Sequence, residues 1–204
     1  MSEQPTSSEM PLEFSALVQQ FMRLPREKKL VAAYEFVRDI AYGNIGSRSA
    51  FDVLDAKKGT CSGKHALLKL LLQELGEEVQ SWFAKHNFGK FPIHPWPSEL
   101  AELQDKDIPD YHDFLKLKVG NEWVTVDAVF DKPLTALGFP ALEWDGKTSM
   151  QLPIDASEIF PAEGEMEDHK KQLISGLPEE AQKKRKEFLT AMTAWLDANR
   201  SSKF

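Results

Sequence analysis

Cysteine is nearly absent from this sequence. Cys61 is the only one among 204 residues, which excludes an intramolecular disulfide framework and any zinc site built from several cysteines. Basic residues are also fewer than acidic ones: the sequence has 25 Lys and Arg and 32 Asp and Glu, which gives a net charge of −7. This balance argues against nucleic acid or an anionic membrane as the main partner. It hints at neutral or basic substrates, unless the acidic side chains lie away from the binding cleft.

Long apolar runs are missing too. The longest, over residues 66–75, is interrupted by Lys69 and Gln73 and is too short to cross a bilayer. The first ten residues are polar and show no signal-peptide pattern, and the histidines have no recognisable metal-ligand spacing. We therefore expect a cytoplasmic protein without membrane contact, metal or other cofactor.

The composition, 42% apolar and 28% charged, is that of a chain that buries a core. We expect a disordered tail over 1–10 and a single domain over 11–204, with a core over about 34–130 and a C-terminal extension over 131–204. The 3.6-residue spacing of apolar positions predicts helices from about residue 12, from Pro25 to Gly43 and after Pro178. We also expect a strand over 79–84, a short helix over 98–103 and an edge strand over 150–154.

The segment 66–75 is apolar around nearly its whole circumference. Six leucines fall in this stretch, from Leu67 to Leu75, so they cannot all lie on one stripe. A helix of this kind is buried, with a sheet on one side and helices on the other.

Cys61 stands where a turn containing Gly59 leads into this helix. Thr60 or Ser62 can cap the helix, because a hydroxyl there accepts a hydrogen bond from a free backbone N–H of the first turn. A thiol at this position feels the partial positive charge of the helix N-terminus, which favours the thiolate. A lone cysteine is more often a small buried hydrophobe, so a nucleophile here requires a base and an orienting carboxylate.

The clearest β pattern lies over 111–119 and 122–130, on either side of Gly120-Asn121. A two-residue loop with Gly first is typical of a type II′ hairpin turn. The resulting register pairs Leu117 with Val124 and makes one consistently apolar face.

The same register makes His112 and Asp127 diagonal neighbours on one face of the hairpin. Such positions are about 7–8 Å apart at the backbone, within reach of an imidazole and a carboxylate. A histidine oriented by a carboxylate is the base half of a nucleophile triad. Each residue has a non-catalytic interpretation when it is taken singly: a strand histidine satisfied by local polar groups for His112, and a hairpin-end carboxylate that pairs with a lysine such as Lys116 for Asp127. Their joint placement favours the catalytic interpretation.

These residues resemble the transglutaminase-like superfamily of papain-like thiol enzymes. The resemblance rests on Gly59-Thr60-Cys61-Ser62-Gly63 leading into the leucine-rich helix, on His112 at the start of a strand, and on Trp123-Val124-Thr125-Val126-Asp127. It covers about residues 34–130 and leaves the two ends unexplained.

The resemblance implies an α+β fold in which a buried helix carrying the cysteine packs on an antiparallel sheet, with flanking N- and C-terminal helices. It implies Cys61 as nucleophile, His112 as general base and acid, and Asp127 as the orienting group. The reaction then passes through a thioester on Cys61, with water or an amine as the acceptor.

Four further residues are weaker candidates for an oxyanion donor or a substrate contact: Tyr42, Asn44, His65 and Trp123. The Cys61 backbone N–H is one expected donor. His65 lies four residues after Cys61 on the same helix face and could compete as the base, but nothing in the sequence orients it, so we expect a structural role.

The leading hypothesis is a hydrolase or acyltransferase that acts on amide bonds of peptides or proteins. An arylamine N-acetyltransferase shares the order of catalytic residues, but its nucleophile follows Arg-Gly-Gly, whereas this chain has Lys58-Gly59-Thr60. A non-catalytic, protein-binding module is the third possibility.

Two segments remain open or peripheral. The irregular stretch 88–111 is either a cover over the site or a surface connection. We interpret the basic run 183–186 as a solvated helix face.

Overall fold

The computed structural model describes residues 10–88, 96–104 and 107–200. Its elements, in chain order, are α1 Leu12–Met22, α2 Arg26–Arg38, β1 Ala41–Tyr42, α3 Ala50–Ala56, β2 Lys58–Gly59, α4 Cys61–Glu74, β3 Val79–Asn87, α5 Ser98–Gln104, β4 Pro109–Val119, β5 Glu122–Val126, a 3₁₀-helix Lys132–Leu137, β6 Glu158–Pro161, α6 Met166–Ser175 and α7 Glu179–Asn199.

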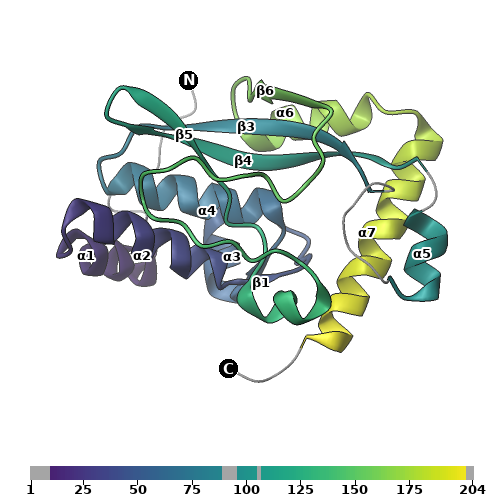
Figure 1. The fold of residues 1–204 in the computed structure, drawn as a ribbon, viewed down its shortest axis with the longest axis horizontal. Coiled ribbons are helices and arrows are strands. Elements are labelled where there is room, and N and C mark those ends of the chain that lie inside the picture. Colours follow the sequence, from purple (N-terminus) through teal and green to yellow (C-terminus); the bar gives the residue numbers. More distant parts are fainter. Residues whose placement is uncertain (1–9, 89–95, 105–106, 201–204) are drawn as a thin grey trace.

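The fold is α+β, as the sequence predicts. Four antiparallel strands form a sheet in the order β5-β4-β3-β6, and the short strands β1 and β2 pair in parallel outside it. Figure 1 shows α4 beneath this sheet and the α1–α2 pair packed further along the same side. Within the described residues, no helix is long and apolar enough to cross a membrane.

Helix α4 lies at the centre of the molecule. Leu67, Leu68, Leu71 and Leu72 are fully buried, and the helix contacts β4 on one side and α2 and α3 on the other. This arrangement agrees with the apolar pattern that surrounds the helix in the sequence, because each side needs an apolar partner.

Lys64 fixes the first turn of α4 to its surroundings. Its ammonium is fully buried and donates to three carbonyl oxygens, those of Arg38 at 2.9 Å, Ile40 at 2.8 Å and Val129 at 2.7 Å. An ammonium has three donors and no acceptor, so all its hydrogen bonds are satisfied. One side chain thereby joins the end of α2, the approach to β1 and the segment after β5.

The β4–β5 hairpin has the predicted register. Val119 pairs with Glu122, Leu117 with Val124 and Leu115 with Val126. Gly120 has a φ of 62°, whereas Asn121 does not have a positive φ, which agrees with a type II′ turn.

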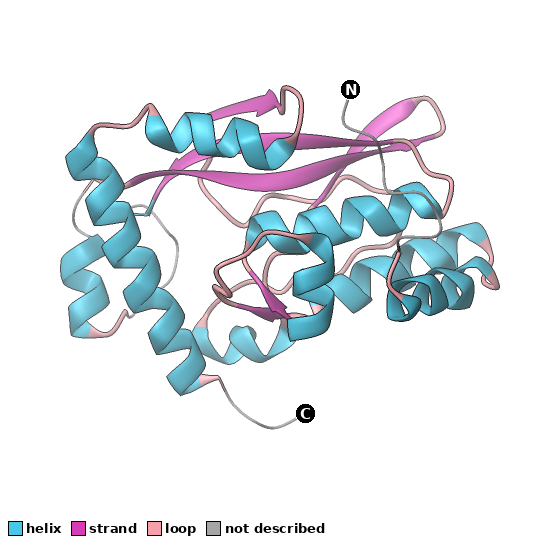
Figure 2. Cartoon of the chain, turned by 180° about the vertical axis from the view of Figure 1, so that it is seen from behind, coloured by secondary structure: helices cyan, strands magenta, loops and turns pink. Residues whose placement is uncertain are grey.

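The segment after residue 130 wraps around this core. Strand β6 pairs with β3, and Figure 2 shows α6 against the sheet, with α7 running down the edge of the molecule beside α5. The chain therefore returns to the sheet after leaving the hairpin.

Several predicted boundaries are wrong. Helix α2 ends at Arg38 and not at Gly43, because the chain leaves the helix to form β1, where the Ala41 N–H donates to the Lys57 carbonyl. No strand forms over 150–154: Met150 donates one backbone hydrogen bond to Thr125, and the N–H of Thr125 is taken by the Ser149 hydroxyl. Helix α3 was not predicted. Residues 1–9 of the expected tail, and residues 89–95 and 105–106 of the expected cover, lie outside the described residues.

Candidate active site

Cys61 is the first residue of α4, and two glycines near it let the chain pack closely against Val53. A β-carbon on Gly59 would lie 2.8 Å from a methyl carbon of Val53, and one on Gly63 would lie 2.6 Å from the same carbon, so only glycine fits at either position. Thr60 is the N-cap residue, but its hydroxyl makes no capping hydrogen bond. The predicted hydroxyl cap is therefore absent, because Ser62 donates instead to the carboxylate of Asp113.

His112 and Asp127 meet as the hairpin register predicts. The Nε2 atom of His112 lies 2.6 Å from Oδ2 of Asp127, and both side chains are buried. The other carboxylate oxygen of Asp127 accepts the backbone N–H of Val129 at 3.1 Å. Asp127 lies just beyond the end of β5, where its carboxylate can turn toward β4.

The charges of this pair support each other. Burial opposes a charge on His112, but the Asp127 carboxylate and the neighbouring Cys61 side chain outweigh burial and raise the pKa of His112 to about 10. Burial also opposes a charge on Asp127, yet His112 holds the pKa of that carboxyl well below its usual range. Because Nε2 faces Asp127, Nδ1 is the nitrogen left to exchange a proton with the Cys61 sulfur.

A second charged pair, which the sequence reasoning missed, borders the sulfur. Oδ2 of Asp113 lies 3.3 Å from Sγ of Cys61 and 2.5 Å from Nζ of Lys170. The same ammonium donates to Oγ of Ser62 at 2.9 Å and lies 3.6 Å from the sulfur. Burial opposes both charges, but each partner stabilises the other, so the pKa of Asp113 is lowered and that of Lys170 is raised.

Little in the sequence could have revealed this second pair. Asp113 directly follows His112, and strand alternation assigns neighbours to opposite faces. Lys170 lies 109 positions from Cys61, on a helix that was not predicted.

The four weaker candidates separate into two groups. Tyr42 and Asn44 line the same cavity as Cys61. His65 is fully buried, and its Nε2 accepts the Ala128 N–H at 2.9 Å, so it supports the segment after β5. Trp123 lies on β5 with the Lys118 ammonium 5.8 Å from its ring centre and does not line the cavity.

The backbone of Tyr42 is held firmly at the cavity wall. Its N–H donates to a carboxylate oxygen of Asp131 at 2.6 Å, and its carbonyl accepts from Arg200 at 2.7 Å. Burial, together with the proximity of Cys61 and Asp110, raises the pKa of the Tyr42 hydroxyl. The phenol therefore stays protonated and can donate a hydrogen bond.

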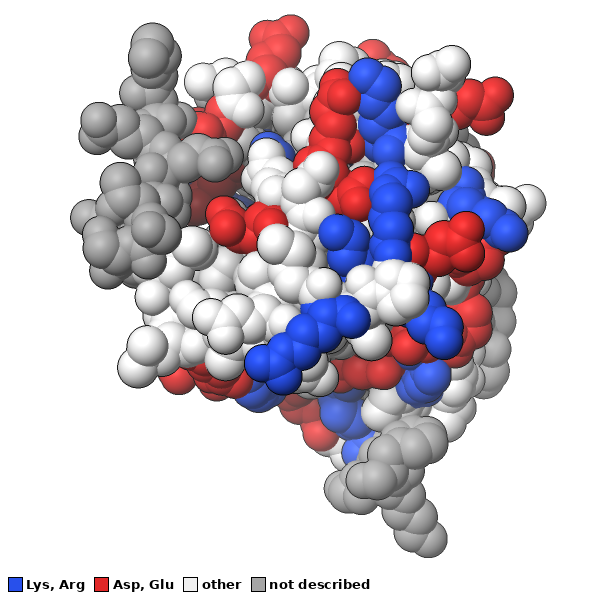
Figure 3. All heavy atoms as spheres, turned by 90° about the vertical axis from the view of Figure 1, so that its left-hand side faces the viewer, with Lys and Arg blue, Asp and Glu red and all other residues white. Residues whose placement is uncertain are grey.

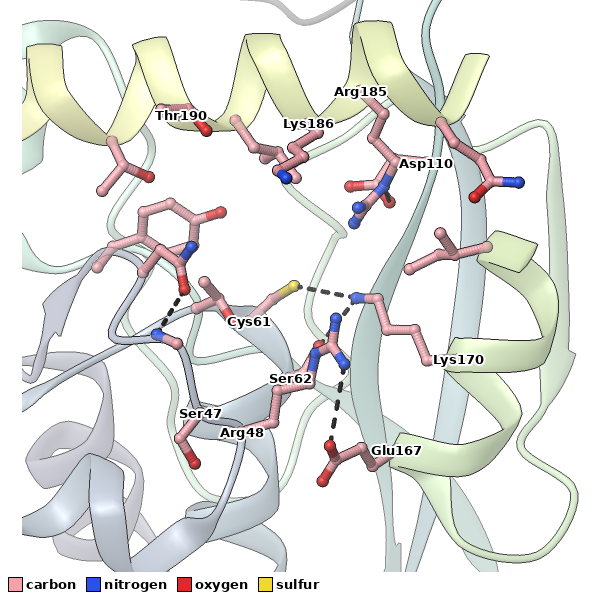
Figure 4. Close-up of a pocket in the computed structure, with 18 of the residues that line it drawn as sticks. Ser47, Arg48, Cys61, Ser62, Asp110, Glu167, Lys170, Arg185, Lys186 and Thr190 are labelled. Atoms are coloured by element: carbon pink, nitrogen blue, oxygen red, sulfur yellow. Dashed lines mark hydrogen bonds and ion pairs between the residues drawn. The ribbon is translucent and has the colours of Figure 1, made fainter. Parts of the chain in front are cut away.

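The cavity has a volume of about 640 Å³ and lies between the start of α4, the loop after β1 and the helices α6 and α7. Figure 4 shows Arg48, Lys170, Arg185 and Lys186 reaching toward the space above Cys61. The basic run 183–186 is thus not only a solvated helix face. Lys183, Arg185 and Lys186 line the cavity. Nε of Arg185 donates a hydrogen bond to Oδ1 of Asp110 at 2.6 Å.

Comparison with known proteins adds little to this geometry. No protein-family model matches the sequence, and no curated protein matches it. One similar structure is a crystal structure of a protein from Cytophaga hutchinsonii that is provisionally described as a cysteine protease, with 17% sequence identity and a TM-score of 0.41. The match covers 66% of this chain and spans about half of that one, 48%. Similarity at this level does not identify a family or an activity.

Within the described residues, no group of three or more His, Cys, Asp and Glu side chains is arranged to hold a metal ion. What the arrangement offers is a thiol at a helix N-terminus, an imidazole paired with a carboxylate, and a protonated phenol. Nucleophilic acyl transfer uses groups of these kinds.

The replacement Asp127→Asn tests the charge of His112. The folded-state pKa of His112, about 10, lies above its unfolded value of about 6.5. Stabilisation by the pair is therefore full below about pH 6.5 and is lost as the pH rises through about 10. On the acid side the pKa of Asp127 is lowered, so its share is lost below about pH 4. We expect urea unfolding to show a loss of about 1–3 kcal/mol near pH 6 that shrinks toward pH 10.

The matched control is Asp155→Asn, an exposed carboxylate whose replacement changes the unfolding free energy by less than about 0.5 kcal/mol. NMR of the His112 ring supplies the direct reading. A ring that titrates near its unperturbed value in the unmodified protein contradicts the ion pair.

Proposed function

We propose that this protein is a cysteine hydrolase or acyltransferase that acts on amide or other acyl groups of peptides or proteins through a thioester on Cys61. The observation that carries the proposal is the 2.6 Å contact between His112 and Asp127 beside a cysteine at a helix N-terminus. The order Cys61, His112, Asp127 and its resemblance to transglutaminase-like enzymes also support it.

The reaction runs in two stages. The Cys61 sulfur attacks the carbonyl carbon, a C–S bond forms, and the carbonyl oxygen becomes an oxyanion. His112 gives its Nδ1 proton to the leaving group, and the C–N bond breaks to leave a thioester. Water or an amine then attacks, His112 takes the proton of that acceptor, and the sulfur leaves as thiolate.

The first test is acylation of the purified protein by p-nitrophenyl acetate. We expect a burst of one p-nitrophenol per chain and one acetyl group on Cys61, located by mass spectrometry. Cys61→Ala abolishes the burst, and His112→Ala slows it by about 10²–10⁴-fold because the proton-transfer partner of the sulfur is lost.

The alternatives give different results. A non-catalytic module yields no burst beyond that of free cysteine at the same pH, and this outcome overturns the proposal. Rapid acetylation of Cys61 by acetyl-coenzyme A would favour the arylamine N-acetyltransferase alternative, and its absence would count against it.

Tyr42 is proposed as an oxyanion donor together with the Cys61 backbone N–H. A fixed donor of this kind stabilises the charge that develops on the carbonyl oxygen, and losing one costs about 10²–10³-fold in rate. We expect Tyr42→Phe to slow acylation by that factor. Alkylation of Cys61 by iodoacetamide, in which no oxyanion forms, should change by less than about threefold. Equal losses in both reactions would reduce Tyr42 to a structural role.

Lys170 is proposed as a positioning residue that neutralises Asp113 next to the sulfur. Without the ammonium, a buried carboxylate would stand 3.3 Å from Cys61 and repel the thiolate. We expect Lys170→Met to slow alkylation by iodoacetamide at pH 7 by about tenfold or more, and to destabilise the fold by about 3 kcal/mol.

The double variant Lys170→Met/Asp113→Asn separates charge from packing. It removes the isolated carboxylate as well, so alkylation and stability should both recover most of the loss, whereas Lys170→Arg should lose little alkylation rate. A double variant that is alkylated no faster than Lys170→Met contradicts this role.

A further inference from the structure

The cavity above Cys61 has the opposite charge balance to the chain as a whole. The sequence carries a net charge of −7, but the cavity is lined by five basic side chains, Arg48, Lys170, Lys183, Arg185 and Lys186, and only two acidic ones, Asp110 and Glu167. On the face at the α1–α2 end of the molecule, by contrast, basic and acidic groups are interspersed (Figure 3). Positive charge is therefore concentrated where a substrate must enter.

Part of this charge is already compensated inside the protein. Asp113, which does not line the cavity, forms an ion pair with Lys170 (Oδ2 to Nζ, 2.5 Å). Asp110 forms one with Arg185 (Oδ1 to Nε, 2.6 Å). Arg48 lies 4.0 Å from Glu167, a contact at the limit of an ion pair. Lys183 lies 4.0 Å from Glu187, at the same limit. The remaining excess is carried by Lys186, with Lys183 beside it on one face of α7.

Lys183 and Lys186 differ from Lys184 on the same helix because both line the cavity. Lys186 points from α7 into the cavity (Figure 4), and Lys183, although its side chain is 78% exposed, also lines it. Lys184 instead pairs with Glu180 at 2.5 Å and does not line the cavity. A walled cavity with one sign of charge attracts counter-ions and raises the rate at which oppositely charged substrates arrive.

We propose that the acyl substrate carries a carboxylate, which binds at the α7 side of the cavity beside Lys183 and Lys186. This deepens the proposed function, on which it rests, by naming a substrate class. The uncompensated charge at this side is that of Lys186, with Lys183 in only a 4.0 Å contact with Glu187, which suits the single charge of a carboxylate better than a dianionic phosphate. It also replaces the expectation, drawn from the overall acidity, of a neutral or basic substrate.

The test compares two alkylating reagents of the same size that differ in charge, iodoacetate and iodoacetamide. The ratio of their rate constants toward Cys61 cancels any change in the reactivity of the sulfur itself. His112 also attracts iodoacetate, so the contribution of α7 is read from variants that leave His112 in place. We expect the ratio to fall by at least threefold in Lys183→Gln/Lys186→Gln, and to fall with added salt in the unmodified protein.

The matched control is Lys171→Gln/Lys184→Gln, which removes the same two charges from α6 and α7 outside the cavity lining. Its ratio should stay within about 1.5-fold of the unmodified protein, since charges outside the cavity are screened. An equal fall in both double variants overturns the inference, because it would reflect net charge only.

Acyl probes give the second reading. The p-nitrophenyl monoester of succinate carries a carboxylate, whereas p-nitrophenyl butyrate has the same chain length and no charge. We expect faster acylation of Cys61 by the succinate ester, with the preference lost in Lys183→Gln/Lys186→Gln. Equal acylation by both esters contradicts the proposed substrate class and leaves the proposed function unaffected. Failure of both, with p-nitrophenyl acetate also inert, overturns the function itself.

Discussion

The ion pair between His112 and Asp127 is the interaction on which the proposed chemistry depends. A buried carboxylate remains charged only when a cation or several donors offset its lost hydration. Here each group compensates the lost hydration of the other, since Asp127 keeps the imidazole protonated and the imidazole keeps Asp127 ionised. The proton that the proposed acyl transfer needs is thereby held on His112, beside Cys61.

The same rule explains the second pair around the sulfur. Asp113 is fully buried and lies against Cys61, which without a partner would oppose a thiolate. Lys170 supplies the partner from α6. The elements after residue 130 are therefore more than a covering of the sheet: α6 completes the electrostatics of the site and α7 forms one wall of the cavity.

Charge in this protein is organised locally and not by its total. The acidic excess of the whole chain says little about the cavity, because fields at this range are dominated by the nearest groups and distant charges are screened. Lys183, Arg185 and Lys186 of α7 line the cavity, whereas Lys184 does not, because its direction from the helix axis differs from theirs.

Local patterns in the sequence determined α4, the β4–β5 hairpin and the neighbourhood of His112 and Asp127, because an all-round apolar helix and a two-residue turn leave few alternatives. Only the tertiary structure decided the rest. The end of α2 depends on pairing between β1 and β2, and the contact of Lys170 with Cys61 joins residues 109 positions apart. Such contacts arise from how packed elements come together in space, which neither periodicity nor turn chemistry encodes.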